Sequence, residues 1–191
     1  NLKHLSKRDS AFLPSYLAAP ANVGGRSAPF VPSLASSAAR RVFAMLVGDL
    51  VLDVTPDKLG PAIAKLRADG SRLNLNLLGE AVLGDKEAAH RMEATAALIE
   101  RDDVDYVSLK VSAVIGPHAP YGHAAAVEEA VEKLLPLYRL AAASSTFINL
   151  DMEEYRDLDL TIDVFTRILD REEFLGYRAG IVLQAYLPDA L

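Results

Sequence analysis

Four short apolar runs recur along the chain, and each carries polar residues toward its C-terminal end. A segment with helical spacing separates each run from the next. Strands that alternate in this way with helices of about 10–15 residues form βαβ units and a parallel sheet. In a parallel α/β barrel the C-terminal ends of the strands build the active site, which suits the polar residues found there. The runs cover residues 72–80, 106–112, 147–153 and 181–186.

This rhythm predicts an α/β fold and, more narrowly, the first half of a parallel (βα)8 barrel with about four strands. A doubly wound sheet is the alternative that the rhythm leaves open. Residues 77–84, which follow the first run, do not match the Gly-x-Gly-x-x-Gly phosphate loop of that class, so a barrel is favoured. A closed barrel needs eight units, whereas the chain stops after its fourth strand. We therefore expect both ends to be cut from a longer protein.

The chain is expected to have three parts. Residues 1–37 form an irregular arm, because proline and glycine interrupt them too often for a long element. Residues 38–70 form a helical lead-in of two helices, the second with Thr55 as N-cap and Pro56 at its first position. Residues 71–191 hold the half barrel. Its expected elements are strands at 72–80, 106–113, 146–152 and 180–186, a helix capped by Asp85 with Ala88, Met92, Ala96 and Ile99 inward, a helix at 124–143, and a helix at 159–170 with Ile162, Phe165 and Leu169 inward.

Composition excludes several classes of function. The net charge of −6, without an offsetting basic stretch, argues against a nucleic-acid partner. The absence of cysteine excludes disulfides, thiolate metal ligands and thiol catalysis. No run reaches the roughly 18–20 apolar residues that span a bilayer, and no signal peptide is evident. We expect a cytoplasmic protein.

Two charged residues are the strongest candidates for chemistry. Lys110 lies between Leu109 and Val111 in the second strand, where a charge must face a pocket, pair with a carboxylate or lie at a sheet edge. It could bind an anionic substrate or, with a lowered pKa, form a Schiff base. Asp151 ends the third strand, on the same face as Asn149. It is expected to face the barrel mouth beside Lys110.

Two further residues are candidates by position. Gln184 lies in the fourth strand, and its amide offers donors and an acceptor to a heteroaromatic ring edge such as that of a flavin. Glu80, just past the first strand, could pair with a cation across the mouth. His90, His118 and His123 lack the spacing of a metal site, so no metal is predicted.

Taken together, the strand ends resemble the proline dehydrogenase family, specifically the barrel of the bifunctional proline-utilisation flavoenzymes. The resemblance covers roughly residues 40–191. The matching motifs are Asn-Leu-Leu-Gly-Glu-Ala at 76–81, Ser-Leu-Lys-Val-Ser-Ala at 108–113, Ile-Asn-Leu-Asp-Met-Glu-Glu at 148–154 and Gly-Ile-Val-Leu-Gln-Ala-Tyr at 180–186.

The resemblance implies FAD-dependent oxidation of L-proline to Δ1-pyrroline-5-carboxylate, with hydride transfer to the flavin N5 and a quinone or membrane acceptor for the electrons. It implies that Lys110 holds the proline carboxylate and that Asp151 lies beside the ring and the flavin. Gln184 would hydrogen-bond the isoalloxazine edge, and Glu80 would gate the substrate by pairing with an arginine.

Parts of the family pattern are missing from the sequence. They are a fifth-strand motif with an arginine near the flavin, a last helix with paired arginines, and a pyrroline-5-carboxylate dehydrogenase domain. We therefore expect the isolated chain to be inactive and to self-associate through exposed strand edges. The alternatives are a non-catalytic half-barrel assembly module and a barrel lyase that uses Lys110 as a Schiff-base nucleophile.

Overall fold

A computed structural model describes residues 40, 47, 51–77, 84–116 and 120–190. The chain divides into two units, Asn1–Leu66 and Arg67–Leu191, which are treated separately. Of the first expected helix, predicted to end at about residue 52, residues 40 and 47 are helical, whereas residues 51 and 52 are not, so the helix ends earlier than predicted. The rest of it, and the expected arm, lie outside the described residues.

The second helix of the lead-in is α3, Pro56–Arg67. It begins at Pro56 as predicted, and the backbone N–H groups of Lys58 and Leu59 donate to the carbonyl of Thr55. Thr55 directly precedes the helix, at the predicted N-cap position, and its hydroxyl donates a hydrogen bond to the carboxylate of Asp53. Gly70, at φ 90°, takes the left-handed conformation that glycine adopts easily just beyond a helix.

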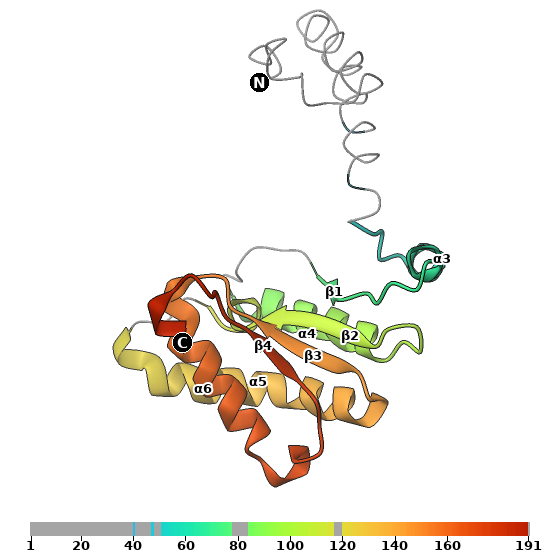
Figure 1. The fold of residues 1–191 in the computed structure, drawn as a ribbon. Coiled ribbons are helices and arrows are strands. Elements are labelled where there is room, and N and C mark those ends of the chain that lie inside the picture. Colours follow the sequence, from blue (N-terminus) through green and yellow to red (C-terminus); the bar gives the residue numbers. More distant parts are fainter. Residues whose placement is uncertain (1–39, 41–46, 48–50, 78–83, 117–119, 191) are drawn as a thin grey trace, which may run out of the picture. The chain divides into compact units, whose positions relative to one another are not determined.

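The second unit is built on a four-stranded parallel sheet in the order β1-β2-β3-β4 (Figure 1). The prediction of an α/β fold with a parallel sheet is therefore confirmed. The strands are shorter than predicted, and the second gives way to a 3-10 turn at Val111–Ala113. Their bounds are β1 Leu75–Asn76, β2 Tyr106–Lys110, β3 Phe147–Asp151 and β4 Gly180–Val182.

Three helices connect successive strands and lie together on one face of the sheet (Figure 1). Sequential strand order with helices on one face is the arrangement of a barrel, whereas a doubly wound sheet reverses its order and carries helices on both faces. Among the described residues, no helix is both long and apolar enough to cross a bilayer. The helices are α4 Asp85–Ile99, α5 His123–Ser144 and α6 Leu158–Leu169.

Two of the predicted helix faces need correction. Asp85 is the first residue of α4 rather than its cap, which is Gly84. Met92 and Ala96, predicted to face inward in α4, are not fully buried. In α6 the buried face lies about one residue before the predicted one. The buried residues are Ala88, Thr95, Leu98 and Ile99 in α4, and Leu158, Leu160, Thr161, Val164 and Ile168 in α6.

The two faces of the sheet differ in chemistry because successive side chains of a strand point to opposite sides. Val107, Leu109, Ile148 and Leu150 are buried, and they form the apolar face of the two central strands. The residues between them are more polar. They are Tyr106, Ser108 and Lys110 in β2, and Phe147, Asn149 and Asp151 in β3.

Candidate active site

Lys110 and Asp151 are the last residues of β2 and β3, and the parallel register pairs them directly. Both therefore lie at the carboxyl end of the sheet, on its polar face. The structure brings together the two residues that the sequence singled out as the strongest candidates.

The ammonium of Lys110 is already engaged. Its Nζ donates to Oε2 of Glu153 at 2.7 Å, and its side chain is only 17% exposed, compared with 55% for Glu153. A partly buried ammonium is costly unless it is paired, and Glu153 serves as its counter-ion. Since Glu153 is largely in water, another anion can replace it at modest cost.

Asp151 belongs to a chain of polar side chains that crosses the strands. Its Oδ1 accepts hydrogen bonds from the hydroxyl of Ser108 at 3.3 Å and from the amide of Asn149. The Ser108 hydroxyl in turn accepts from the amide of Asn74 at 2.8 Å and from that of Asn149 at 3.3 Å. Ser108 and Asn149 are both buried, so this chain holds Asp151 in one orientation.

Burial raises the pKa of the Asp151 carboxyl above its ordinary value. The hydrogen bonds from Ser108 and Asn149 act against this shift, as does the charge of Lys110, while the charge of Glu153 adds to it. Desolvation of the carboxylate is the largest effect and decides the direction.

Gln184 lies at the same end of the sheet as Asp151, beyond the end of β4. Its Nε2 donates to the backbone carbonyl of Glu153 at 2.9 Å. No described residue donates to its Oε1, which leaves one acceptor available. Glu80, the fourth predicted site residue, lies outside the described residues.

Sequence reasoning did not assign a role to Ser108, Asn74 or Glu153. A signal was present for Ser108, because it precedes Lys110 by two residues within β2 and strand alternation places both on the same face. Glu153 lies two residues beyond the end of β3, where alternation does not apply. Asn74 could not be found in this way, because its partner Ser108 is 34 positions away.

Comparison with known proteins agrees with the resemblance found in the sequence. A model of the proline dehydrogenase family matches residues 59–191, which is more than half of the chain. The bifunctional protein PutA of Klebsiella aerogenes is 28% identical over 147 residues, covering 70% of this chain and 11% of the relative. The PutA of Escherichia coli K12 matches to the same extent. The chain thus spans about a tenth of these relatives.

Solved structures of proline utilization A are similar in both sequence and fold. The protein from Corynebacterium freiburgense has a TM-score of 0.71 and 43% identity, over 97% of this chain and 18% of that one. The Bdellovibrio bacteriovorus protein, inactivated by N-propargylglycine, has a TM-score of 0.74 and 29% identity, over 84% of this chain and 19% of that one. These neighbours confirm the prediction of a partial barrel of the proline dehydrogenase type. The chain belongs to the proline dehydrogenase family.

Proposed function

We propose that this domain supplies one side of the active site of an FAD-dependent enzyme that oxidises L-proline to Δ1-pyrroline-5-carboxylate. The observation that carries the proposal is the pairing of Lys110 with Asp151 at the carboxyl end of the polar face. Proline has a carboxylate next to a ring nitrogen, so it matches a neighbouring cation and anion.

In this proposal Lys110 binds the proline carboxylate. The substrate replaces Glu153 as the partner of the ammonium, and the exposed Glu153 side chain turns into water. The exchange keeps the charge of Lys110 compensated before and after binding, so it avoids the cost of an unpaired cation.

Asp151 holds the ring of the substrate in place from the adjacent strand. Its carboxylate is fixed by Ser108 and Asn149, so it presents a stationary acceptor toward the ring nitrogen. A fixed acceptor favours one orientation of the ring over others, which is the main contribution a protein makes when a cofactor carries the electron chemistry.

Gln184 fits one edge of a flavin. Its amide is held through Nε2 by the carbonyl of Glu153, and Oε1 remains available to accept a hydrogen bond from a ring N–H. Asp151 lies at the same end of the sheet and is the second residue we propose for the cofactor. When bound, FAD supplies the acceptor for the hydride that leaves proline. A quinone or membrane acceptor would then reoxidise it.

The test is proline-dependent reduction of a dye by the complete gene product loaded with FAD, together with the visible absorption spectrum of the purified protein. Lys110→Met should lower kcat/KM for proline about 10- to 100-fold, since a charge-assisted hydrogen bond contributes about 1.5–3 kcal/mol. Lys86→Met, on an exposed position of α4, is the matched control and should leave kcat/KM unchanged. A colourless protein that is inert toward proline would overturn the proposal.

Borohydride separates this proposal from the lyase alternative. Reduction in the presence of a carbonyl substrate traps a Schiff base on Lys110 if that lysine is a nucleophile. The flavin proposal predicts no such adduct, and Lys110→Met would then affect only the binding of the substrate carboxylate.

We also propose that the 191-residue chain alone is inactive and self-associates. In the described part of the chain β1 and β4 have an unpaired edge, and Val182 of β4 is 43% exposed. Exposed apolar strand edges recruit other strands. Val182→Lys should shift light scattering toward the monomer, whereas Val54→Lys, at an exposed position of the other unit, should not. A wild-type monomer would contradict this expectation.

A further inference from the structure

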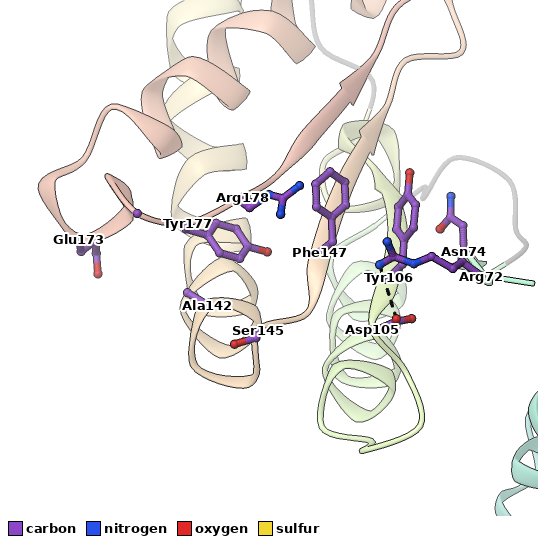
Figure 2. A pocket seen from close by; sticks show the side chains of 11 residues that line it. Arg72, Asn74, Asp105, Tyr106, Ala142, Ser145, Phe147, Glu173, Tyr177 and Arg178 are labelled. Carbon is purple, nitrogen blue, oxygen red and sulfur yellow. Dashed lines mark ion pairs between the residues drawn. The ribbon is translucent and has the colours of Figure 1, made fainter. Parts of the chain in front are cut away.

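A cavity lies at the amino-terminal end of the sheet, at the other end of the strands from Lys110 and Asp151 (Figure 2). Its volume is about 890 Å³, and its lining includes Tyr106 and Phe147, the first residues of β2 and β3. A volume of this size is within the range of small-molecule sites. Neither the substrate nor the flavin of the proposed function uses it.

Two of the three aromatic rings of the lining pack against each other. Tyr106 and Phe147 pack edge to face, with their centroids 4.9 Å apart and an angle of 73° between the rings. Both side chains lie on the polar face of the sheet and are partly exposed. They offer an apolar surface to a flat ring, because aromatic groups associate well in edge-to-face or offset arrangements.

The two carboxylates of the lining are already compensated. Asp105 accepts a hydrogen bond from Arg67 at 2.5 Å. Glu173 accepts two from Arg139, at 2.8 and 2.9 Å, which is the bidentate arrangement of a strong pair. Neither Arg67 nor Arg139 lines the cavity, so each carboxylate is neutralised by an arginine from outside.

Two further arginines belong to the lining. Arg72 forms a long ion pair with Asp105, at 3.7 Å, shares this carboxylate with Arg67, and has a side chain that is 79% exposed. Arg178 makes no ion pair with any described residue. In Figure 2 the guanidinium group of Arg178 extends toward Phe147, and that of Arg72 extends toward Tyr106. Arg72 and Arg178 equal Asp105 and Glu173 in number within the lining, and Arg67 and Arg139 add two positive charges from outside it, so the surroundings of the cavity are positively charged next to its aromatic surface.

We propose that this cavity binds a small anion that carries a flat ring, of the class of the aromatic carboxylates. The carboxylate would lie between the guanidinium groups of Arg72 and Arg178, whose planar forks match its two oxygens. The ring would lie on Tyr106 and Phe147. Asn74, which uses its amide nitrogen to bind Ser108, is a neutral neighbour that does not repel an anion.

The test is calorimetric titration of the purified chain with 2-naphthoate, and separately with 2-naphthylmethanol, which has the same ring without the charge. We expect saturable binding of 2-naphthoate and binding of the alcohol that is at least about tenfold weaker, since loss of one charge-assisted pair costs a factor of about ten or more. Arg72→Gln and Arg178→Gln should each weaken 2-naphthoate about tenfold.

Arg156→Gln is the matched control. Arg156 is 63% exposed and follows β3 at the opposite end of the sheet, so its loss should leave the affinity unchanged. Far-UV circular dichroism checks that the variants keep the fold, which is expected because Arg72 and Arg178 are exposed. Equal binding of acid and alcohol, arginine variants that match Arg156→Gln, or no saturable binding would each overturn the proposal. None of these results bears on proline oxidation, which depends on the other end of the sheet.

Discussion

Lys110 and Asp151 are paired in the register of β2 and β3, yet the ammonium of Lys110 binds Glu153 instead of Asp151. The Asp151 carboxylate accepts hydrogen bonds from Ser108 and Asn149 on the same polar face. The cation and the anion of the candidate site thus each have another partner. In the proposed function, a zwitterionic substrate therefore binds between them without first breaking an ion pair between the two.

The raised pKa of Asp151 predicts a specific dependence of stability on pH. In the folded chain the carboxyl holds its proton more tightly than in the unfolded chain, where its pKa has the ordinary value of 3.8. The folded state therefore binds more protons between the two pKa values, and the free energy of unfolding falls as the pH rises through that window. Asp151→Asn removes the cost of ionising a buried carboxyl. The stability of this variant relative to wild type should therefore increase from about pH 4 upward until Asp151 is fully ionised.

Urea unfolding over this range measures the effect. Asp103→Asn is a control of opposite sign, because hydrogen bonds from Arg101 lower the pKa of Asp103. Its carboxylate stabilises the fold above the ordinary pKa, and that contribution is lost as the pH falls below about 4. A stability difference between Asp151→Asn and wild type that does not change with pH would show that Asp151 is not desolvated.

The ion pair of Lys110 with Glu153 predicts a change in chemical reactivity. Glu153→Gln removes the charge that holds the amine, so Lys110 should react faster with acetic anhydride. An ion pair with an exposed partner such as Glu153 contributes about 0.5–1 kcal/mol. Its loss corresponds to an increase of about two- to fivefold in the labelling rate of Lys110. Mass spectrometry of peptides gives the rate for each lysine, and Lys58, paired with Asp53 in the other unit, serves as the internal reference. An unchanged ratio of the two rates would mean that Glu153 does not restrain Lys110.

The positions of Lys110 and Asp151 could be predicted because side chains in a strand alternate between the two faces of the sheet. The alternation of apolar and polar residues fixed the face on which Lys110 and Asp151 lie, and the parallel sheet fixed the end. The lengths of the strands were predicted less well. Residues 111–113 continue the apolar pattern of β2, but they form a 3-10 turn, and apolarity alone does not distinguish the two.

Other features depend on contacts between distant parts of the chain and left no local signal. The buried face of α6 is set by how the helix meets its neighbours, and several apolar residues compete for that position. The amide of Gln184 meets the carbonyl of Glu153 across 31 positions. Motif recognition placed Gln184 at the site, but only the fold shows what holds its amide.

Gly180 is predicted to be required for the packing of β3 against β4. A Cβ atom at this position would lie 2.8 Å from Oδ1 of Asn149 and 2.9 Å from Cζ of Phe147. Asn149 is buried in the polar chain and cannot move freely. Gly180→Ala should therefore destabilise the fold by about 1–3 kcal/mol, as overpacking does elsewhere. Gly176→Ala, where a Cβ meets nothing within 4 Å, should stay within about 0.5 kcal/mol of wild type in the same urea titration. Equal effects of the two substitutions would contradict the packing argument.

Tyr138 and Tyr177 pack edge to face with their centroids 6.2 Å apart, but substitution by Phe should destabilise the fold only at Tyr177. The hydroxyl of Tyr177 donates to the carbonyl of Thr146 at 2.7 Å and accepts from the N–H of Ile148 at 3.2 Å. The hydroxyl thereby pairs two backbone groups at the start of β3. Burial raises the pKa of Tyr177 to about 12. Tyr177→Phe leaves both backbone groups without this partner, which should cost about 1–3 kcal/mol.

Tyr138 is fully buried, and no described residue bonds its hydroxyl. Burial raises its pKa, so the group stays neutral at physiological pH. Because a buried hydroxyl without a partner is unfavourable, Tyr138→Phe should leave the free energy of unfolding unchanged or raise it by about 1 kcal/mol. Thermal unfolding of the two variants beside wild type is the measurement, with a shift of about 2–4 °C for each kcal/mol. If Tyr138→Phe destabilises the fold as much as Tyr177→Phe does, then the Tyr138 hydroxyl has a partner and the assignment of this core position is wrong.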